Sequence, residues 1–129
     1  MSKSDNIEIK QIFLWRLDKK NHDAMVQFSN QVDYLFKKNG FQPPEIFQLI
    51  ESDQSSKSMG FVNLAKAISA NQDEEEIWLE LHSYRDSKQQ KEVGAIMQKD
   101  ETAGQLFKQF MDLIIPGSCI EGQFSHLKI

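Results

Sequence analysis

The nine-residue segment 76–84, EIWLELHSY, alternates strictly between two kinds of side chain, which is the period of a β-strand with two different faces. We expect helices to cover its aliphatic face. The other face is both aromatic and polar, so we expect it to meet a partner subunit or to enclose a ligand. The aliphatic face carries Ile77, Leu79 and Leu81, and the mixed face carries Glu76, Trp78, Glu80, His82 and Tyr84.

The first half of the chain predicts a strand, a helix and a second strand. Residues 8–17 are partly apolar on both faces, which is typical of a central strand. Five apolar side chains then recur at helical spacing within 21–39, with Asn21 as the expected N-cap and an Asn-Gly pair at the end. A short strand is predicted over 46–50.

The second half predicts further helices and a last strand around the alternating segment. Residues 52–58 form a polar turn, and 59–68 fit either an extended segment or a short helix. Helical spacing returns after the alternating strand, with capping boxes that begin at Ser87 and Thr102. This region is therefore either one kinked helix or two, and a strand over 118–127 follows it.

Two strand–helix–strand units in succession predict an α+β fold, namely a ferredoxin-like βαββαβ sandwich with an antiparallel sheet. A chain of 129 residues suits a single domain, 1–129, in which residues 1–6 are expected to be frayed. With both helices on one face, the other face of the sheet would be bare in the monomer. We therefore expect a homodimer in which two sheets face each other, as in a dimeric α/β barrel.

Composition narrows the classes of function. The net charge of −4 provides no basic field for phosphates, so no nucleic-acid partner is expected. No apolar run approaches the ~20 residues needed to span a bilayer, and the N-terminus lacks a secretory signal, so we expect no membrane partner and a cytoplasmic location. The single cysteine, Cys119, is expected to be a small hydrophobe in a strand. No nucleotide-binding motif is present, so no cofactor is expected.

His82 is the best candidate for a catalytic residue, with Glu80 beside it as the second. The two lie on the same face of one strand, about 6.5–7 Å apart along the chain, so that the carboxylate could fix the tautomer of the imidazole. Trp78 and Tyr84 are expected to supply the walls of a ligand site, and Arg85 an anchor for an anion. The alternative, which we favour for His82 itself, is a histidine hydrogen-bonded within a dimer interface.

His126 on the last strand is a further candidate for ligand binding. It could meet His82 only if the two strands paired in the right register. A metal site of His82, His126 and Glu80 is arithmetically feasible, but no close HxxxH or CxxC spacing supports it, so no metal is expected. His22 stands at a helix start, where solvent exposure is the simple interpretation.

Three stretches resemble a known family. Residues 61–68, FVNLAKAI, the strand with its continuation over 76–87, and the strand-to-helix turn over 17–24 are similar to the YbaA-like family of unknown function. The chain departs from that family at Asp100 and in its last strand, as a divergent member would. The resemblance implies a dimeric α+β barrel and brings no activity that could be transferred to any residue.

Together these observations predict a small homodimer that binds a small apolar or aromatic ligand between its two sheets. Two other functions stay open. One is a cofactor-independent monooxygenase or isomerase with His82 as the base. The other is a purely structural association module with a filled interface.

Overall fold

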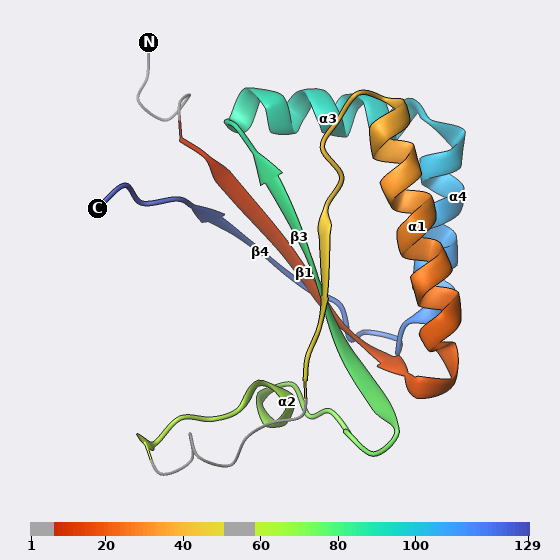
Figure 1. The fold of residues 1–129 in the computed structure, drawn as a ribbon, viewed down its shortest axis with the longest axis vertical. Helices are drawn as coiled ribbons and strands as arrows, with labels where there is room; N and C mark the ends of the chain where they lie inside the picture. The colour runs from red at the N-terminus through yellow and green to blue at the C-terminus, as the bar shows by residue number, and fades with distance from the viewer. Residues whose placement is uncertain (1–6, 51–58) are drawn as a thin grey trace.

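The structure is a computed structural model that describes residues 7–50 and 59–129, so the fraying expected at 1–6 and the turn predicted at 52–58 lie outside the described residues. The chain forms an α+β fold around one four-stranded antiparallel sheet in the order β2-β3-β1-β4 (Figure 1). This arrangement is compatible with the predicted ferredoxin-like fold, and it makes β1 a central strand as predicted. The strands are β1 (Ile9–Asp18), β2 (Glu45–Gln48), β3 (Glu75–Tyr84) and β4 (Ile120–Ser125).

The helices resolve both alternatives that the sequence left open. The ambiguous segment contains a single helical turn, and the region after β3 forms two helices that meet at Asp100. A short 3-10 turn over Lys19–Asn21 joins β1 to the first helix. The helices are α1 (His22–Lys38), α2 (Leu64–Ala67), α3 (Ser87–Lys99) and α4 (Glu101–Leu113).

Aspartates cap the two helices after β3, one or two residues before the predicted positions. The predicted caps Ser87 and Thr102 are wrong. The carboxylates of Asp86 and Asp100 accept the hydrogen bonds from the free backbone N–H groups at these helix starts instead. A carboxylate is favoured at this place since it both accepts hydrogen bonds and faces the positive end of the helix dipole. Asn21 does stand at the cap of α1, but its side chain makes no capping hydrogen bond.

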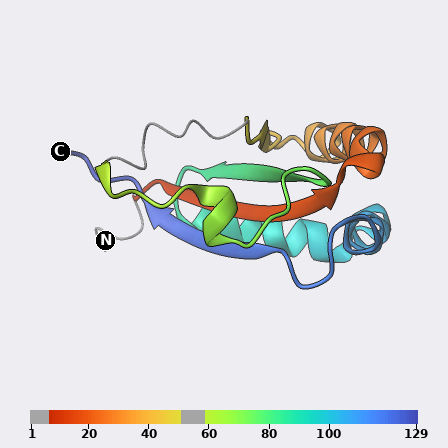
Figure 2. The same cartoon turned by 90° about the horizontal axis from the view of Figure 1, so that it is seen from below.

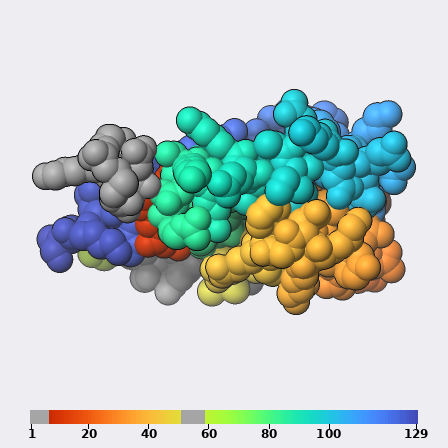
Figure 3. Space-filling model, turned by 90° about the horizontal axis from the view of Figure 1, so that it is seen from above, coloured from red at the N-terminus to blue at the C-terminus, as the bar shows by residue number. Residues whose placement is uncertain are grey.

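The helices cover the mixed face of β3, so the predicted orientation of the sheet is wrong. Trp78 is 4% exposed and belongs to the main core cluster with Trp15 and Leu17 of β1. Figures 1 and 2 show α1 and α4 on this side of the sheet, with α2 on the other. Seen from the end near α3, the side chains of α3 and α4 adjoin those of α1 (Figure 3). The five apolar positions predicted for the first helix, Met25, Phe28, Val32, Leu35 and Phe36, are all buried.

The register between the two central strands explains which face is covered. Trp15 lies directly opposite Trp78, so the odd-numbered face of β1 continues the mixed face of β3. The two indole rings stack with centroids 6.5 Å apart. Together the two strands present far more aromatic surface on this face than on the other. Covering it therefore removes more apolar area from water, which is the larger gain in free energy.

The opposite side of the sheet, which we call the outer face, consists of the even-numbered side chains of β1 and β4 and the odd-numbered ones of β2 and β3. At one end α2 covers it, where Ala65 packs with Leu14 and Ile77 in a second, smaller cluster. Towards the edges of the sheet, Phe47 and Phe124 are 46% and 57% exposed. The outer face thus has an apolar middle with charged side chains such as Lys10 and Arg16 near the strand ends, and the described residues cover it only in part.

Candidate functional site

Two cavities adjoin on the helix side of the sheet, and His82 lines both of them. One cavity, of about 420 Å³, lies at the end of β3 and is mainly polar. The other, of about 410 Å³, lies between the sheet and helices α1, α3 and α4 and is mainly apolar. We call them the polar cavity and the apolar cavity.

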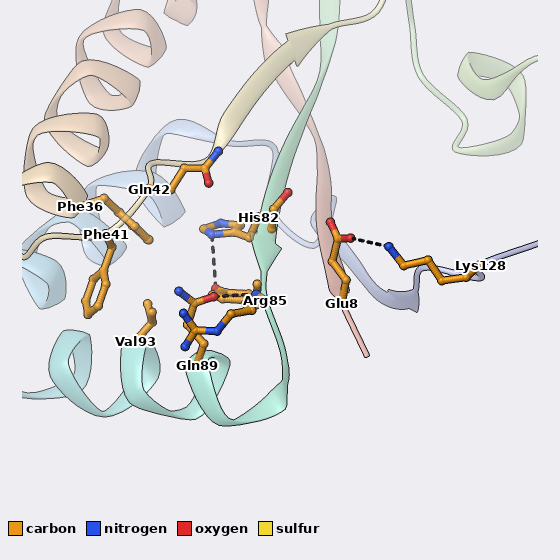
Figure 4. Close-up of a pocket in the computed structure, with 11 residues that line it drawn as sticks. Glu8, Phe36, Phe41, Gln42, His82, Arg85, Gln89, Val93 and Lys128 are labelled. Carbon is orange, nitrogen blue, oxygen red and sulfur yellow. Dashed lines mark hydrogen bonds and ion pairs between the residues drawn. The ribbon is translucent and has the colours of Figure 1, made fainter. Parts of the chain in front are cut away.

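The polar cavity gathers side chains from both ends of the chain and from the start of α3. In Figure 4, His82 points to the same side of β3 as Phe36, Phe41 and Val93, whereas the Glu8–Lys128 ion pair lies beside β1. The cationic groups here are largely exposed, since the side chain of Arg85 is 71% accessible. The lining consists of Glu8, Phe36, Phe41, Gln42, His82, Ser83, Tyr84, Arg85, Gln89, Val93 and Lys128.

The apolar cavity is walled mainly by phenylalanine and methionine. Its polar groups are the side chains of Glu80, His82 and Cys119. A cavity of this size with few convergent polar groups is typical of small-molecule sites. The other lining residues are Phe13, Phe28, Val32, Leu35, Phe36, Met97, Ala103, Leu106, Phe107, Phe110 and Met111.

Glu80, His82 and Tyr84 form a hydrogen-bonded row along β3. Nε2 of His82 lies 2.8 Å from Oε2 of Glu80, and Nδ1 lies 3.5 Å from the hydroxyl of Tyr84. Both contacts are satisfied if the imidazole donates from Nε2 to the carboxylate and accepts from the phenol at Nδ1. Burial, assisted by the negative charge of Glu80, raises the pKa of Tyr84, so this phenol keeps its proton and can donate.

Aromatic rings hold the imidazole of His82 in place. Phe13 meets it edge-on with centroids 5.6 Å apart, and Phe36 lies at the same distance from another side. Tyr84 stacks on it at 6.1 Å with an interplanar angle of 12°. The side chain of His82 is 11% accessible, so the ring is enclosed yet borders both cavities. This combination suits a group that contacts a bound ligand.

A second carboxylate–imidazole pair, between Glu76 of β3 and His22 of α1, stabilises the fold. Glu76 accepts hydrogen bonds from Nε1 of Trp78 at 2.9 Å and from Nδ1 of His22 at 2.9 Å. The hydrogen bond to Glu76 raises the pKa of His22. His22 was expected to be solvated, but it is half-buried and ties the start of α1 to the sheet. Because both partners of Glu76 belong to the fold, we assign this pair to stability.

The structure separates the predicted site residues. Tyr84 and Arg85 line the polar cavity together with His82, and Glu80 lines the apolar cavity. Trp78 lines neither cavity and is a core residue. His126 is also apart from His82, because β1 lies between β3 and β4.

His126 lies next to Glu8, with Nδ1 at 3.1 Å from the carboxylate, and is half-exposed. Within 7–50 and 59–129, no cluster of three or more His, Cys, Asp or Glu side chains could hold a metal ion. Cys119 is half-buried against the core, and burial raises the pKa of its thiol, with Glu80 and Glu121 adding to the effect. It therefore stays a protonated thiol in the wall of the apolar cavity.

The sequence did not indicate that phenylalanines of α1 and α4 line a cavity. They were assigned to ordinary helix cores. A signal was present in α4, where Phe107 and Met111 extend the apolar stripe beyond what one packed face needs. In the structure these two side chains are 65% and 46% exposed and border the apolar cavity.

Neither the known protein-family profiles nor the curated protein sequences match this chain. In the part of the chain that the structure describes, no helix has both the length and the apolar character needed to cross a bilayer.

Proposed function

We propose that the protein is a homodimer in which each protomer binds a small apolar or aromatic ligand in its apolar cavity, with Glu80 and His82 as the polar contacts. The observation that carries this proposal is the Glu80–His82 pair, 2.8 Å apart, in the wall of an otherwise apolar cavity of about 410 Å³. A few polar groups that converge on an otherwise apolar space are typical of a small-molecule site, in which they fix the orientation of the ligand.

The ligand site lies within one protomer, between the sheet and its own helices. This differs from the predicted site between two sheets, because Trp78 and its neighbours on the mixed face pack against α1 and α4. The polar and apolar cavities meet at His82, so a bound molecule could place an apolar body among the phenylalanines and a polar group beside the imidazole.

The outer face supports the homodimer. Apolar side chains from all four strands lie on it, and several near its edges are half-exposed, including Phe47, Ile120 and Phe124. Apolar surface of this kind usually marks an association site, and a two-fold pair of sheets would cover it. The resemblance to the YbaA-like family, which implies a dimeric α+β barrel, supports the same arrangement.

Filling the apolar cavity should abolish ligand binding. Ala103 lines this cavity, so Ala103→Phe places a ring in the space that a ligand needs. We expect the parent protein to bind the neutral fluorophore prodan with a blue shift of its emission, and Ala103→Phe to bind it at least tenfold more weakly. The matched control is Ala67→Phe on α2, which lies outside the cavity and should bind prodan as the parent does.

Circular dichroism of each variant establishes whether it is folded before binding is compared. If Ala103→Phe does not fold, then Cys119→Leu, which also adds volume to the wall, takes its place. Equal binding by a folded cavity-filled variant and by the parent would overturn the proposed site. The absence of any prodan binding by the parent would favour the purely structural association module.

The alternative function is an enzyme with His82 as the general base. The observation in its favour is the Glu80–His82–Tyr84 row, in which the carboxylate orients the imidazole. The Nδ1 contact to Tyr84, at 3.5 Å, is at the limit of a hydrogen bond, so Nδ1 is the better placed nitrogen to take a proton from a substrate. Conversion of a bound compound, detected by mass spectrometry of the extracted ligand, distinguishes this function from simple binding.

A further inference from the structure

The apolar cavity contains a carboxylate but no matching cation. Glu80 lines it, whereas neither lysine nor arginine stands among the described residues of its wall. The exposed cations near His82, such as Arg85, belong to the polar cavity instead. A ligand in the apolar cavity therefore meets negative charge and aromatic rings together.

The neighbours of Glu80 on the sheet leave part of its carboxylate unpaired. Phe13 lies directly opposite it on β1, and Ile46 lies opposite it on β2. Oε2 pairs with His82, but Oε1 has no hydrogen-bond partner among the described residues. The side chain is 17% accessible, so bulk water reaches this oxygen only in part. Such a group favours a hydrogen-bond donor, and above all a charged donor.

The aromatic walls favour the same kind of ligand. Phe13, Phe36 and Phe110 line the cavity, and the faces of such rings attract cations. The negative charge of Glu80 also reaches Cys119, next to β4 on the same side of the sheet, where it helps to keep the thiol protonated. The carboxylate and the aromatic rings therefore both favour a cationic ligand.

We propose that the ligand of the apolar cavity is an apolar amine, bound as its ammonium ion, with the charged group at Glu80 and the hydrocarbon body among the phenylalanines. This inference rests on the proposed function, since it names the chemical class of the ligand for the same site. It excludes the carboxylic acids that an anchor such as Arg85 would favour.

Three compounds with the same phenylethyl body test the inference. They are 2-phenylethylamine, 2-phenylethanol and 3-phenylpropanoate, compared as competitors of prodan at about pH 8, where the amine is protonated and the acid is ionised. We expect the amine to displace prodan at a concentration at least tenfold lower than the carboxylate, with the alcohol between them.

Glu80→Gln removes the charge and keeps the shape of the side chain. In this variant the amine and the alcohol should therefore displace prodan at concentrations that differ by no more than about twofold. The matched control is Glu121→Gln on β4, which removes a nearby exposed carboxylate and should preserve the preference for the amine. Displacement by all three compounds at similar concentrations, or a preference that survives in Glu80→Gln, would overturn the amine assignment while leaving the cavity as a ligand site. Failure of prodan to bind the parent protein would overturn both.

Discussion

Replacing Trp78 with alanine is expected to lower the free energy of unfolding by about 3–5 kcal/mol, a large part of the ~5–15 kcal/mol typical of a domain. The indole is 4% exposed, stacks on Trp15 and donates a hydrogen bond to Glu76. Its removal leaves a cavity in the main core. Urea unfolding followed by circular dichroism measures the loss.

Because the surroundings of Trp78 come from the same protomer, Trp78→Ala should keep the oligomeric state of the parent. Tyr34 on α1 provides the matched control, since this ring is 70% exposed and its replacement by alanine should cost less than about 1 kcal/mol. A Trp78→Ala variant that keeps its stability but dissociates would show that the mixed face of β3 meets a partner, and would contradict the observed orientation of the sheet.

Placing a carboxylate at Ile12 is expected to convert the proposed dimer into a folded monomer. Ile12 lies on the outer face of the central strand β1, between Leu81 of β3 and Gly122 of β4. In a dimer of facing sheets, Ile12→Asp would bury an unpaired charge, which costs several kcal/mol, so association should weaken at least about a hundredfold. Analytical ultracentrifugation over a range of protein concentrations measures the shift.

The control for this change is Tyr34→Asp, which introduces the same charge on an exposed part of α1 away from the outer face. It should leave the proposed dimer intact. A parent protein that stays monomeric at high concentration would overturn the homodimer. An Ile12→Asp variant that dimerises as tightly as the parent would place the interface somewhere other than the outer face.

Local patterns in the sequence predicted the elements well. The alternation over 76–84 identified β3, and the apolar spacing of α1 named a set of residues that are all buried. Both patterns depend only on the period of a single element. The break between α3 and α4 was harder to predict, because it depends on Asp100, whose extended backbone ends one helix and whose carboxylate caps the next.

The covered face of the sheet could not be deduced from β3 alone. Its aliphatic side, with Ile77 and Leu79, has the simpler apolar pattern, yet the side with Trp78 is the one buried under helices. The choice depends on the register that brings Trp15 opposite Trp78 and so sums the aromatic area of two strands. Register is a property of the paired strands and has no signature in either segment by itself.

The sequence predicted the polar pair of the candidate site but not its apolar walls. Spacing along one strand was enough to place Glu80 and His82 as a pair, and the structure brings them within 2.8 Å. The phenylalanine walls could not be predicted, since most of these rings come from helices α1 and α4, which are distant in sequence. Their position over the sheet follows from the packing of α1 against α4.

The most direct test of the ligand site uses the methionine methyl groups as reporters in a ¹H–¹³C spectrum of the protein titrated with 2-phenylethanol. Met97 and Met111 line the apolar cavity, whereas Met59 is 69% exposed and lies outside it. We predict saturable shifts of the Met97 and Met111 signals with Met59 unchanged. Shifts confined to Met59, or no shift of Met97 and Met111 at any concentration, would contradict a ligand site between the sheet and its helices.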